Sequence, residues 1–246
     1  MKTTLALQAR MGSSRLPQKA LRLINRRTLL ECIVGQVKGA KLVTHLALAT
    51  SDSPQEKELI AKARGLGLST HVGAVDDIVG RLFVAAQETD CDVLVRIWGD
   101  CAFICPDVID EMILHFVEHH FEFLNNENYP GGLDVEIYSR DLLNRMNAEV
   151  RDLKQREFPV EFVKLSSAKR GTYRPKEMIP GAHLTIDYLE DLVAAEKIYS
   201  LLESVGPIFT YNDLVHLFRQ MPALASEFSK AERNIEYNRY LNSIKG

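Results

Sequence analysis

A short stretch near the start of the chain combines small side chains with three positive charges. It reads Gln8-Ala9-Arg10-Met11-Gly12-Ser13-Ser14-Arg15-Leu16-Pro17-Gln18-Lys19. Backbone N–H groups approach phosphate oxygens most closely where side chains are small, while arginine and lysine supply the counter-charge. The stretch contains neither GxxxxGK[ST] nor GxGxxG, so a P-loop NTPase is disfavoured. These residue types favour a triphosphate-binding loop, and a solvated basic surface loop is the alternative.

Two aspartates follow apolar runs. Asp100 comes after the run at 91–98, and Asp187 comes after the run at 183–186. A carboxylate in such a place can hold Mg²⁺ against phosphate oxygens. Asp100 could instead serve a turn or cap a helix. Asp187 to Glu190 has the form of a capping box for the next helix, and a capping role can coexist with metal binding.

Several further polar residues could have either a functional or a structural role. Asp134 and Glu136 are two apart in a predicted strand, so they lie on one face, either binding substrate hydroxyls or facing solvent. Arg96 lies inside an apolar strand, which predicts a buried carboxylate partner. His183 is interpreted as structural, and the pair at 119–120 as the C-terminal end of a helix.

The elements that must position these residues alternate regularly in the first half. Strand-like runs at 4–8, 45–50, 69–72 and 91–98 are separated by helical patterns at 28–37, 53–64 and 76–89. This order predicts right-handed βαβ units and an α/β fold with a mainly parallel, doubly wound sheet. Ligands of such sheets bind beyond the carboxyl ends of the strands. That rule selects the basic loop, the loop after Val72, and Gly99-Asp100.

The second half is less regular. We predict helices at 106–120, 139–148, 152–168, 188–202 and 212–220, strands at 122–124, 133–138 and 183–186, and a polar helical tail. We expect a single domain over 1–246, in which residues of about 120–180 form an inserted lobe for substrate binding or dimerisation.

Bulk composition excludes several classes of protein. The net charge of -3 gives no global basic field for nucleic acid, and no apolar run approaches the roughly 20 residues of a membrane helix. The apolar run after Met1 is too brief for a signal peptide, so we expect a cytoplasmic protein. None of the four cysteines forms a CxxC pair, which predicts buried thiols rather than zinc ligands: Cys32, Cys91, Cys101 and Cys105.

Four motifs, in this order, resemble those of the sugar-activating cytidylyltransferases. The loop is similar to LxQARMGSSRLPxKxL, and Val95 to Cys101 is similar to VRxxxDCP. Tyr129 to Glu136 resembles FPDGLDVE, and Leu184 to Leu192 resembles LTVDTPEDL. The family includes 3-deoxy-manno-octulosonate cytidylyltransferase, acylneuraminate cytidylyltransferases and spore-coat polysaccharide biosynthesis F-type proteins. The matches span roughly residues 4 to 200.

The resemblance implies a nucleotide-diphospho-sugar transferase-like fold that commonly forms homodimers. It implies transfer of CMP from CTP to a sugar or sugar acid of the nonulosonic or octulosonic type, for surface glycan synthesis, with Mg²⁺ as cofactor. Arg10 and Lys19 would bind the triphosphate with help from Arg15, while Asp100 and Asp187 would hold the metal. Arg10, Lys19 and Asp100 are thus the expected catalytic residues.

We expect further contacts in two groups. The nucleotide would touch, besides these cations, Gln8, Ala9, Gly12, Ser13, Ser14 and Asp77. The acceptor would touch Asn126, Asp134 and Glu136. The sequence does not identify the acceptor or prove the preference for cytosine.

This sequence departs from the family pattern at four positions. Gln18 replaces the usual glycine before the lysine, and Ala102 replaces proline after the Asp-Cys pair. Gly80 stands before Arg81 where an aspartate is expected, and Phe158 replaces a histidine. Two alternatives therefore stay open. One is a glycosyltransferase that uses a nucleotide-sugar, although the Asp-x-Asp motif expected at the strand end is absent. The other is a weakly catalytic or non-catalytic nucleotide-binding homologue.

Overall fold

The computed structural model describes residues 1–233 and 235–243. Seven strands of these residues form one sheet in the order β5-β4-β1-β6-β8-β7-β9. The strands are β1 Thr3–Gln8, β4 His45–Ser51, β5 Ser69–Gly73, β6 Val93–Trp98, β7 Phe123–Asn125, β8 Val135–Ser139 and β9 Arg170–Thr172. A small separate hairpin pairs β2 Leu23–Ile24 with β3 Arg27–Thr28.

Most neighbouring strands run in the same direction. β5, β4, β1 and β6 are parallel, and β7 is parallel to β9. β8 is antiparallel to both β6 and β7. The prediction of a mainly parallel sheet is confirmed. The strand order also places β1 beside β6, so the loops that follow these two strands leave the sheet at the same edge.

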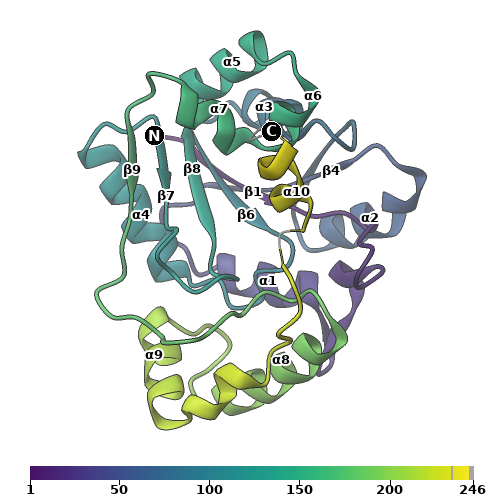
Figure 1. Cartoon of the computed structure of the whole chain (residues 1–246), viewed down its shortest axis with the longest axis vertical. Helices are drawn as coiled ribbons and strands as arrows, with labels where there is room; N and C mark the ends of the chain where they lie inside the picture. Colours follow the sequence, from purple (N-terminus) through teal and green to yellow (C-terminus); the bar gives the residue numbers. More distant parts are fainter. Residues whose placement is uncertain (234, 244–246) are drawn as a thin grey trace.

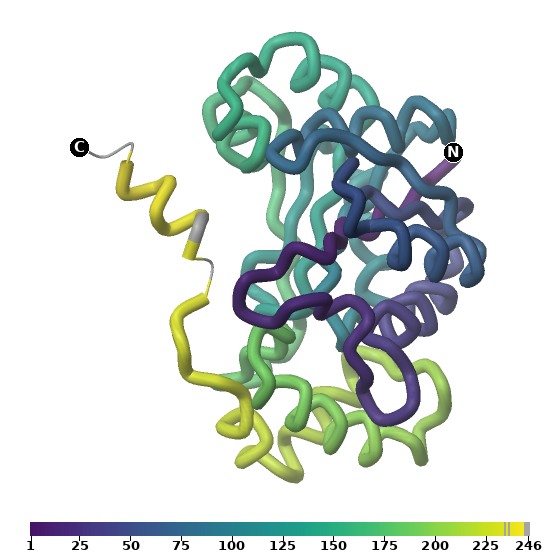
Figure 2. The backbone as a smooth tube through the Cα atoms, turned by 90° about the vertical axis from the view of Figure 1, so that its right-hand side faces the viewer, coloured from purple at the N-terminus to yellow at the C-terminus, as the bar shows by residue number. Residues whose placement is uncertain are grey.

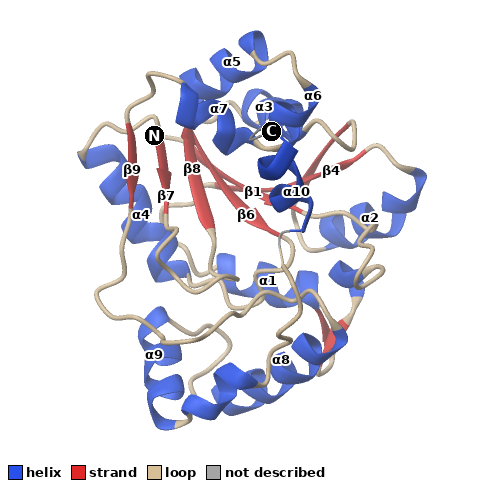
Figure 3. Ribbon diagram, viewed as in Figure 1, coloured by secondary structure: helices blue, strands red, loops and turns tan. Residues whose placement is uncertain are grey.

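Helices cover both faces of the sheet (Figures 1 and 3). The larger apolar cluster joins one face to α1 Leu29–Val37, α2 Lys57–Gly65, α4 Pro106–Glu118, α8 Leu189–Leu202 and α9 Tyr211–Gln220. The smaller cluster joins the other face to α3 Ile78–Glu88, α5 Arg140–Glu149 and α7 Pro159–Leu165. The remaining helices are α6 Leu153–Glu157, α10 Ile235–Ser243 and short 3-10 turns at Lys19–Leu21 (η1), Pro54–Glu56 (η2) and Pro222–Ser226 (η3).

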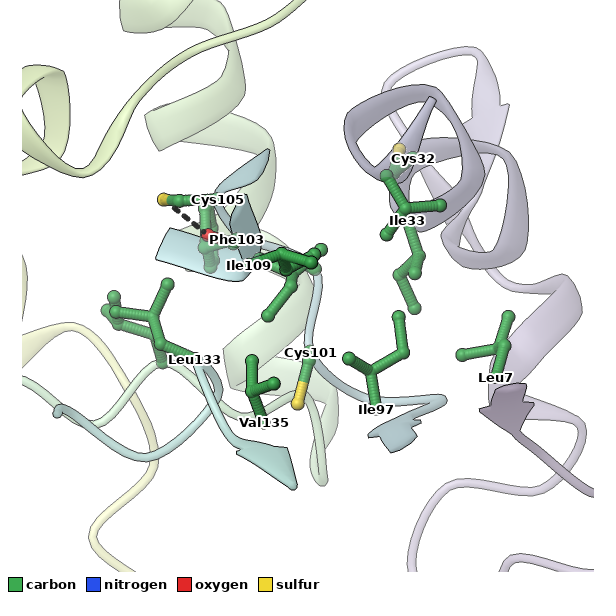
Figure 4. Packing of buried hydrophobic residues seen from close by; sticks show 14 of the residues in the cluster. Leu7, Cys32, Ile33, Ile97, Cys101, Phe103, Cys105, Ile109, Leu133 and Val135 are labelled. Carbon is green, nitrogen blue, oxygen red and sulfur yellow. Dashed lines mark hydrogen bonds between the residues drawn. The ribbon is translucent and has the colours of Figure 1, made fainter. Parts of the chain in front are cut away.

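Alternation along the strands explains the two layers. Leu5 and Leu7 of β1 belong to the larger cluster, whereas Ala6 between them belongs to the smaller one. Successive strand side chains point to opposite faces, so apolar residues on both sides are needed where helices cover both. Figure 4 shows Leu7 and Ile97 on the same side of their strands, facing the helix that carries Ile33. Cys101 and Cys105 lie in this packing as buried free thiols.

Two sequence predictions need correction. Residues 183–186 are not a strand. They run extended between two loops, where Leu184 N donates to Gly131 O at 2.6 Å and Ile186 N donates to Asp100 O at 3.1 Å. Gly132 makes this approach feasible: its φ is +94°, and a Cβ there would lie 2.4 Å from the Leu184 carbonyl carbon.

The predicted helix at 152–168 is two helices, α6 and α7. Phe158 separates them with φ −120° and ψ 76°, and Pro159 begins α7. Proline lacks the N–H that would continue the first helix and disfavours helical geometry in the residue before it. The sequence analysis also missed β9 and the β2–β3 hairpin, which are too short to show a period.

The segment from about 120 to 180 contributes β7, β8 and β9 to the sheet and contains α5 to α7. Its role as a substrate or dimerisation lobe stays a prediction. Among the residues that the structure describes, no helix has both the length and the apolar character needed to span a membrane.

Candidate active site

A cleft lies at the carboxyl ends of β1 and β6 and has two adjoining lobes. The loop lobe is lined mainly by the basic loop after β1, from Gln8 to Lys19, together with Arg81 and Arg239. The side lobe extends past β7 and β8 to α7, and its lining includes Asn126, Asp134, Glu136, Phe158, Lys164 and His183. Both lobes share Gln8, Arg10, Arg15, Trp98, Asp100 and Ile235. A molecule in one lobe would therefore meet a molecule in the other beside Asp100.

The basic loop is fixed at Met11. Met11 O accepts hydrogen bonds from Ser13 N at 2.9 Å and from Gln18 N at 3.2 Å. Met11 and Leu16 are buried, while Gly12 and Ser14 between them are exposed toward the cleft. The backbone of the Gly-Ser stretch is thus held by two apolar anchors and remains accessible to a ligand. This arrangement disfavours the alternative of an ordinary surface loop.

Glu56 holds the loop from behind. Its buried carboxylate accepts from Met11 N at 3.0 and 3.2 Å, from Ser51 Oγ at 2.7 Å and from Thr50 Oγ at 3.2 Å. Glu56 belongs to η2, and the two hydroxyls come from the end of β4. One carboxylate therefore ties the start of the loop to the neighbouring strand. Glu56 was not predicted from the sequence, because nothing in its local pattern distinguishes it from a helix-start glutamate.

Lys19 lies between the two aspartates. Its Nζ is 2.7 Å from Asp100 Oδ2 and 3.0 Å from Asp187 Oδ1, and it also donates to Ile186 O. Burial alone would lower the pKa of Lys19, but Asp100 and Asp187 outweigh it and raise the pKa above its ordinary value. Lys19 therefore stays charged, and the two carboxylates stand close enough to share one cation.

The capping prediction for Asp187 is wrong. Asp191 caps α8 instead, because its carboxylate accepts from the backbone N–H groups of Asp187 and Tyr188. The Asp187 side chain is buried behind two residues that line the cleft, Arg15 and Lys19, and Arg15 Nη2 donates to its Oδ1 at 2.6 Å. Burial favours a higher pKa for Asp187, yet Lys19 and Arg15 prevail and lower it. Asp187 is thus an ionised carboxylate inside the site.

A buried hydrogen-bonded row connects the two lobes. Arg96 donates from Nε to Gln8 Oε1 and from Nη1 to Glu136 Oε2, both at 2.7 Å. Tyr138 donates to the same Glu136 oxygen at 2.5 Å, and the Arg96 guanidinium lies 4.2 Å from the ring centre of Trp98. The predicted buried partner of Arg96 is confirmed. The row fixes Gln8 at the entrance of the loop and Glu136 on β8.

Asn126 and Asp134 shape the wall of the side lobe. Asn126 donates to Leu133 O and accepts from Val135 N, both at 2.7 Å, so it closes the turn between β7 and β8. Asp134 precedes β8, and its Oδ2 accepts from Gly132 N at 2.7 Å. Burial, with a smaller contribution from the charges of Asp100 and Glu136, raises the pKa of Asp134 to about 6.

His183 also lines the side lobe. Its Nε2 lies 2.9 Å from Thr185 Oγ1, and its pKa is lowered by burial and then by the nearby charge of Arg233. An imidazole that stays neutral beside Gly131 serves the packing of this wall, in keeping with the structural interpretation.

Asp77 lies apart from the other predicted nucleotide contacts. Its carboxylate accepts from Gly80 N at 2.7 Å and receives Arg156 Nε and Nη2 at 2.7 and 2.9 Å. A Cβ at position 80 would come within 2.4 Å of Asp77 Oδ2. Glycine is therefore required beside this ion pair, and the unusual Gly80 has a structural reason. The geometry does not bring Asp77 to the cleft.

Gln18 adopts the left-handed conformation that glycine favours, with φ 57° and ψ 30°. A non-glycine residue pays roughly 1–2 kcal/mol for this geometry. The departure from the family glycine therefore changes the residue type and leaves the backbone shape of the loop intact.

The cations that were not predicted as site residues include Arg81 and Arg239 of the loop lobe, Lys164 of the side lobe, and Arg233 beside Asp187. Arg81 of α3 is buried, donates to Val75 O and Asp77 O, and lines the loop lobe. Burial, together with the charges of Arg96 and Arg10, lowers the pKa of Arg81 to about 10. An arginine on the apolar side of a helix was the available signal. Arg233 Nη1, 3.4 Å from Asp187 Oδ2, lies in a polar tail that carries no local signal.

The chain is similar to several known proteins. The model of a protein family described as cytidylyltransferase matches residues 5–212. The spore coat polysaccharide biosynthesis protein SpsF of Bacillus subtilis is 28% identical over 240 residues, covering 90% of this chain and 95% of SpsF. A 3-deoxy-manno-octulosonate cytidylyltransferase of Chloroherpeton thalassium is 31% identical over 121 residues, covering 48% of each chain.

A solved structure extends the likeness to three dimensions. A cytidylyltransferase from Leptospira borgpetersenii superposes with a TM-score of 0.86 at 27% identity. The match covers 94% of this chain and 100% of that one. The family match ends at residue 212, so the last part of the chain, including Arg233 and α10, lies beyond it.

Proposed function

This chain belongs to the cytidylyltransferase family, and from that premise we propose that it transfers CMP from CTP to a sugar-acid acceptor in a Mg²⁺-dependent reaction. Its fold is that of the nucleotide-diphospho-sugar transferases, and its reaction class is nucleotidyl transfer. The observation that carries the proposal is Lys19 between Asp100 and Asp187, where the two lobes meet. Pyrophosphate is the leaving group.

The loop lobe suits the triphosphate. Arg10, Arg15 and Lys19 provide positive charge, and the exposed backbone at Gly12 and Ser14 provides N–H donors. Arg81 of α3 adds a further positive charge to the lining of this lobe. The phosphates would therefore be neutralised by groups that are already in place before the substrate arrives, which is the arrangement that favours charge stabilisation during transfer.

The residues present fit a divalent metal. Asp100 and Asp187 come from different parts of the chain, yet one ammonium group contacts both. Their carboxylate oxygens are the ligands that Mg²⁺ prefers, and Mg²⁺ uses one or two carboxylates together with phosphate oxygens. Bound there, the ion would supply polarisation of the α-phosphate and would favour ionisation of the attacking hydroxyl.

The side lobe suits the acceptor. Asp134 and Glu136 offer carboxylate oxygens to hydroxyl groups, and Asn126 holds the wall that presents them. The Chloroherpeton relative is named for an eight-carbon sugar acid, which supports an acceptor of that class. The name of SpsF supports a role in polysaccharide synthesis.

The chemical step follows from this division. The acceptor oxygen, held in the side lobe, attacks the α-phosphorus as the bond to pyrophosphate breaks on the opposite side. Binding of the two substrates on either side of Asp100 would hold the reacting atoms close together and in the right orientation, which lowers the entropic part of the barrier. Lys19 and Arg15 hold the departing pyrophosphate, and loss of one such charge typically costs roughly 10²–10³ in rate.

An acceptor panel tests the proposed reaction. The protein is incubated with each nucleoside triphosphate, Mg²⁺ and a series of octulosonic and nonulosonic acids, and pyrophosphate release is measured. We expect release with CTP and at least one acid. Binding of CTP without release for any acid would reject the transferase in favour of a nucleotide-binding homologue. Release of a nucleoside mono- or diphosphate from a nucleotide-sugar donor, with no pyrophosphate released from any triphosphate, would favour the glycosyltransferase instead.

The role of Asp187 is tested by Asp187→Asn. The substitution removes one of the two carboxylates, so we expect turnover to fall about 10²-fold or more and the Mg²⁺ requirement to rise. Glu190→Gln, an exposed change in the first turn of α8, serves as control. Unchanged turnover and unchanged Mg²⁺ dependence in Asp187→Asn would exclude Asp187 from the metal site.

Two further expectations belong to the same proposal. The four unpaired buried cysteines suit a reducing compartment, which supports a cytoplasmic location. Family resemblance supports a homodimer, with the segment of about 120–180 as its contact. Sedimentation velocity at micromolar concentration should then give the mass of two chains. A single-chain mass would reject the dimer.

A further inference from the structure

The C-terminal segment crosses the mouth of the cleft. Figure 2 shows it as the yellow stretch that runs alongside the purple loop after β1. Ile235 lines both lobes, Tyr237 lines the side lobe, and Arg239 lines the loop lobe. The segment begins after η3, beyond the part of the chain that matches the family model. It contributes to the cleft from the solvent side, opposite the strands.

The near end of the segment is anchored beside Asp187. Arg233 donates to Asp191 Oδ1 at 2.8 Å, to Thr185 O at 2.9 Å and to Ser229 O at 3.0 Å. Ser229 N also donates to Asp191 Oδ1 at 2.8 Å. Asp191 is fully buried, so Arg233 pairs with a carboxylate that is largely removed from water. Such charge-assisted hydrogen bonds are stronger than neutral ones.

The far end is anchored on α7. The ring of Phe158 lies 5.1 Å from that of Tyr240 in a stacked arrangement and 5.2 Å from that of Tyr237. Tyr237 donates to Glu161 Oε1 at 2.5 Å and accepts from Lys164 Nζ at 3.0 Å. An aromatic residue at 158 gives the helix a surface for ring packing. Phe158 therefore contributes directly to the docking of α10 on α7.

Between these anchors α10 lies over the place where the lobes meet. Ile235 is the one apolar side chain of α10 that lines both lobes among the residues that the structure describes, and Asp100 lines both from the opposite side. An acceptor that reaches toward Asp100 from the side lobe would pass between Ile235 and the wall formed by Asp134. The size of this passage depends on where α10 sits.

We infer that α10 is the outer wall of the side lobe and that Ile235 and Tyr237 determine which acceptors fit. The inference rests on the proposed transferase function for the identity of the ligand. It rests on the two anchors for the position of the wall. A wall built from a separate helix, rather than from the sheet, can differ between relatives that share the same nucleotide-binding loop.

Hydrogen exchange tests the position of the wall without any substrate. We compare wild type with Tyr240→Ala, which removes the stacked ring, and with Tyr240→Phe, which keeps it. Tyr240 does not line either lobe. Amide exchange over 235–243 should be at least tenfold faster in Tyr240→Ala than in wild type and nearly unchanged in Tyr240→Phe. Exchange in wild type at the rate of an unstructured peptide would overturn the inference.

Initial rates test the role of the wall. With CTP, Mg²⁺ and the acids that the panel finds active, Tyr240→Ala should raise the acceptor KM about tenfold while kcat stays within threefold. Ile235→Ala should change the ratio of kcat/KM between the two best acceptors at least fivefold, and Asn242→Ala, exposed on the same helix, should change neither value. Unchanged acceptor KM and unchanged ratios would overturn the inference.

The two proposals fail separately. If the protein turns over an acid but the amides of α10 exchange without protection, the inference about the wall is rejected and the proposed transferase function is kept. A protected α10 with no turnover for any acid would reject the transferase, and with it the assignment of Ile235 and Tyr237 to acceptor choice.

Discussion

At the scale of single residues, the site depends on where charges are buried and what they face. Lys19 and Asp187 are both largely removed from water, and each is compensated by the other. Breaking such a pair by removing one partner costs more than the pair contributes, because an unpaired buried charge remains. Arg15 and Arg233 approach the same aspartate, so Asp187 is surrounded by three cations. In the proposed metal site, the ion would replace one of these cations beside a carboxylate that is already in position.

Asp134 gives the site a pH dependence that can be measured. Its pKa of about 6 lies above the value near 4 of an unfolded aspartate, so the folded state holds an extra proton between these values. Stability therefore falls as pH rises through this window. Asp134→Asn cannot titrate, so its stability relative to wild type should rise by about 1 kcal/mol between pH 5 and pH 7.5. Urea unfolding at both pH values measures this change.

The exposed Asp52 provides the matched control for that experiment. Asp52→Asn should show the same stability difference from wild type at both pH values. If the stability difference between Asp134→Asn and wild type were also the same at both pH values, that result would contradict the raised pKa of Asp134.

At the scale of elements, the loop and the two strands beside it act as one unit. Met11 is held by Glu56, and Glu56 is held by hydroxyls at the end of β4. The left-handed Gln18 closes the loop before η1. The position of Arg10 and Lys19 over the sheet edge therefore depends on a carboxylate from η2.

Glu56→Gln should loosen this unit. The amide replaces an acceptor oxygen with a donor that faces other donors, so stability should fall by about 1–3 kcal/mol. The KM for CTP should rise several-fold, because the loop is no longer fixed at Met11. Thermal unfolding and initial rates measure the two effects, with the exposed Glu58→Gln as control. A loss of stability with an unchanged KM would show that Glu56 supports the fold without positioning the loop.

The predicted elements show where local patterns suffice. Helices α1, α3, α4 and α8 begin within two residues of their predicted starts, because caps, proline and apolar periods are encoded locally. The segment at 183–186 was wrongly predicted as a strand, because its apolar residues are buried although no neighbouring strand pairs with it. The N-cap of α8 is Tyr188, and the carboxylate that accepts from the backbone N–H groups at this end is that of Asp191 rather than Asp187.

At the scale of the whole molecule, the cleft is assembled from distant parts of the chain. The loop after β1, the end of β6, the segment before α8 and α10 meet at Asp100. A ligand that binds the folded state and not the unfolded chain stabilises the whole protein through these contacts. The nucleotide preference can therefore be read from global stability.

CTP with Mg²⁺ should raise the melting temperature. At a concentration of about 100 times the Kd, a ligand adds about 2.7 kcal/mol, which is roughly 5–11 °C for a domain of this size. We expect smaller shifts with ATP, GTP and UTP, and a smaller shift with CTP when Mg²⁺ is chelated. Differential scanning calorimetry measures these values. Equal shifts for all four nucleotides would contradict a preference for cytosine.

The sequence by itself determined the layered α/β fold, the basic loop and the four family motifs, because these follow from periodicity and local residue types. It also indicated that Arg96 needs a buried partner. Only the tertiary structure decided that Lys19 joins Asp100 and Asp187, which lie 81 and 168 residues away along the chain. It alone showed that Asp77 pairs with Arg156 and that Phe158 receives α10. Local sequence restricts backbone conformation and capping, whereas contacts between distant segments depend on how the completed layers pack.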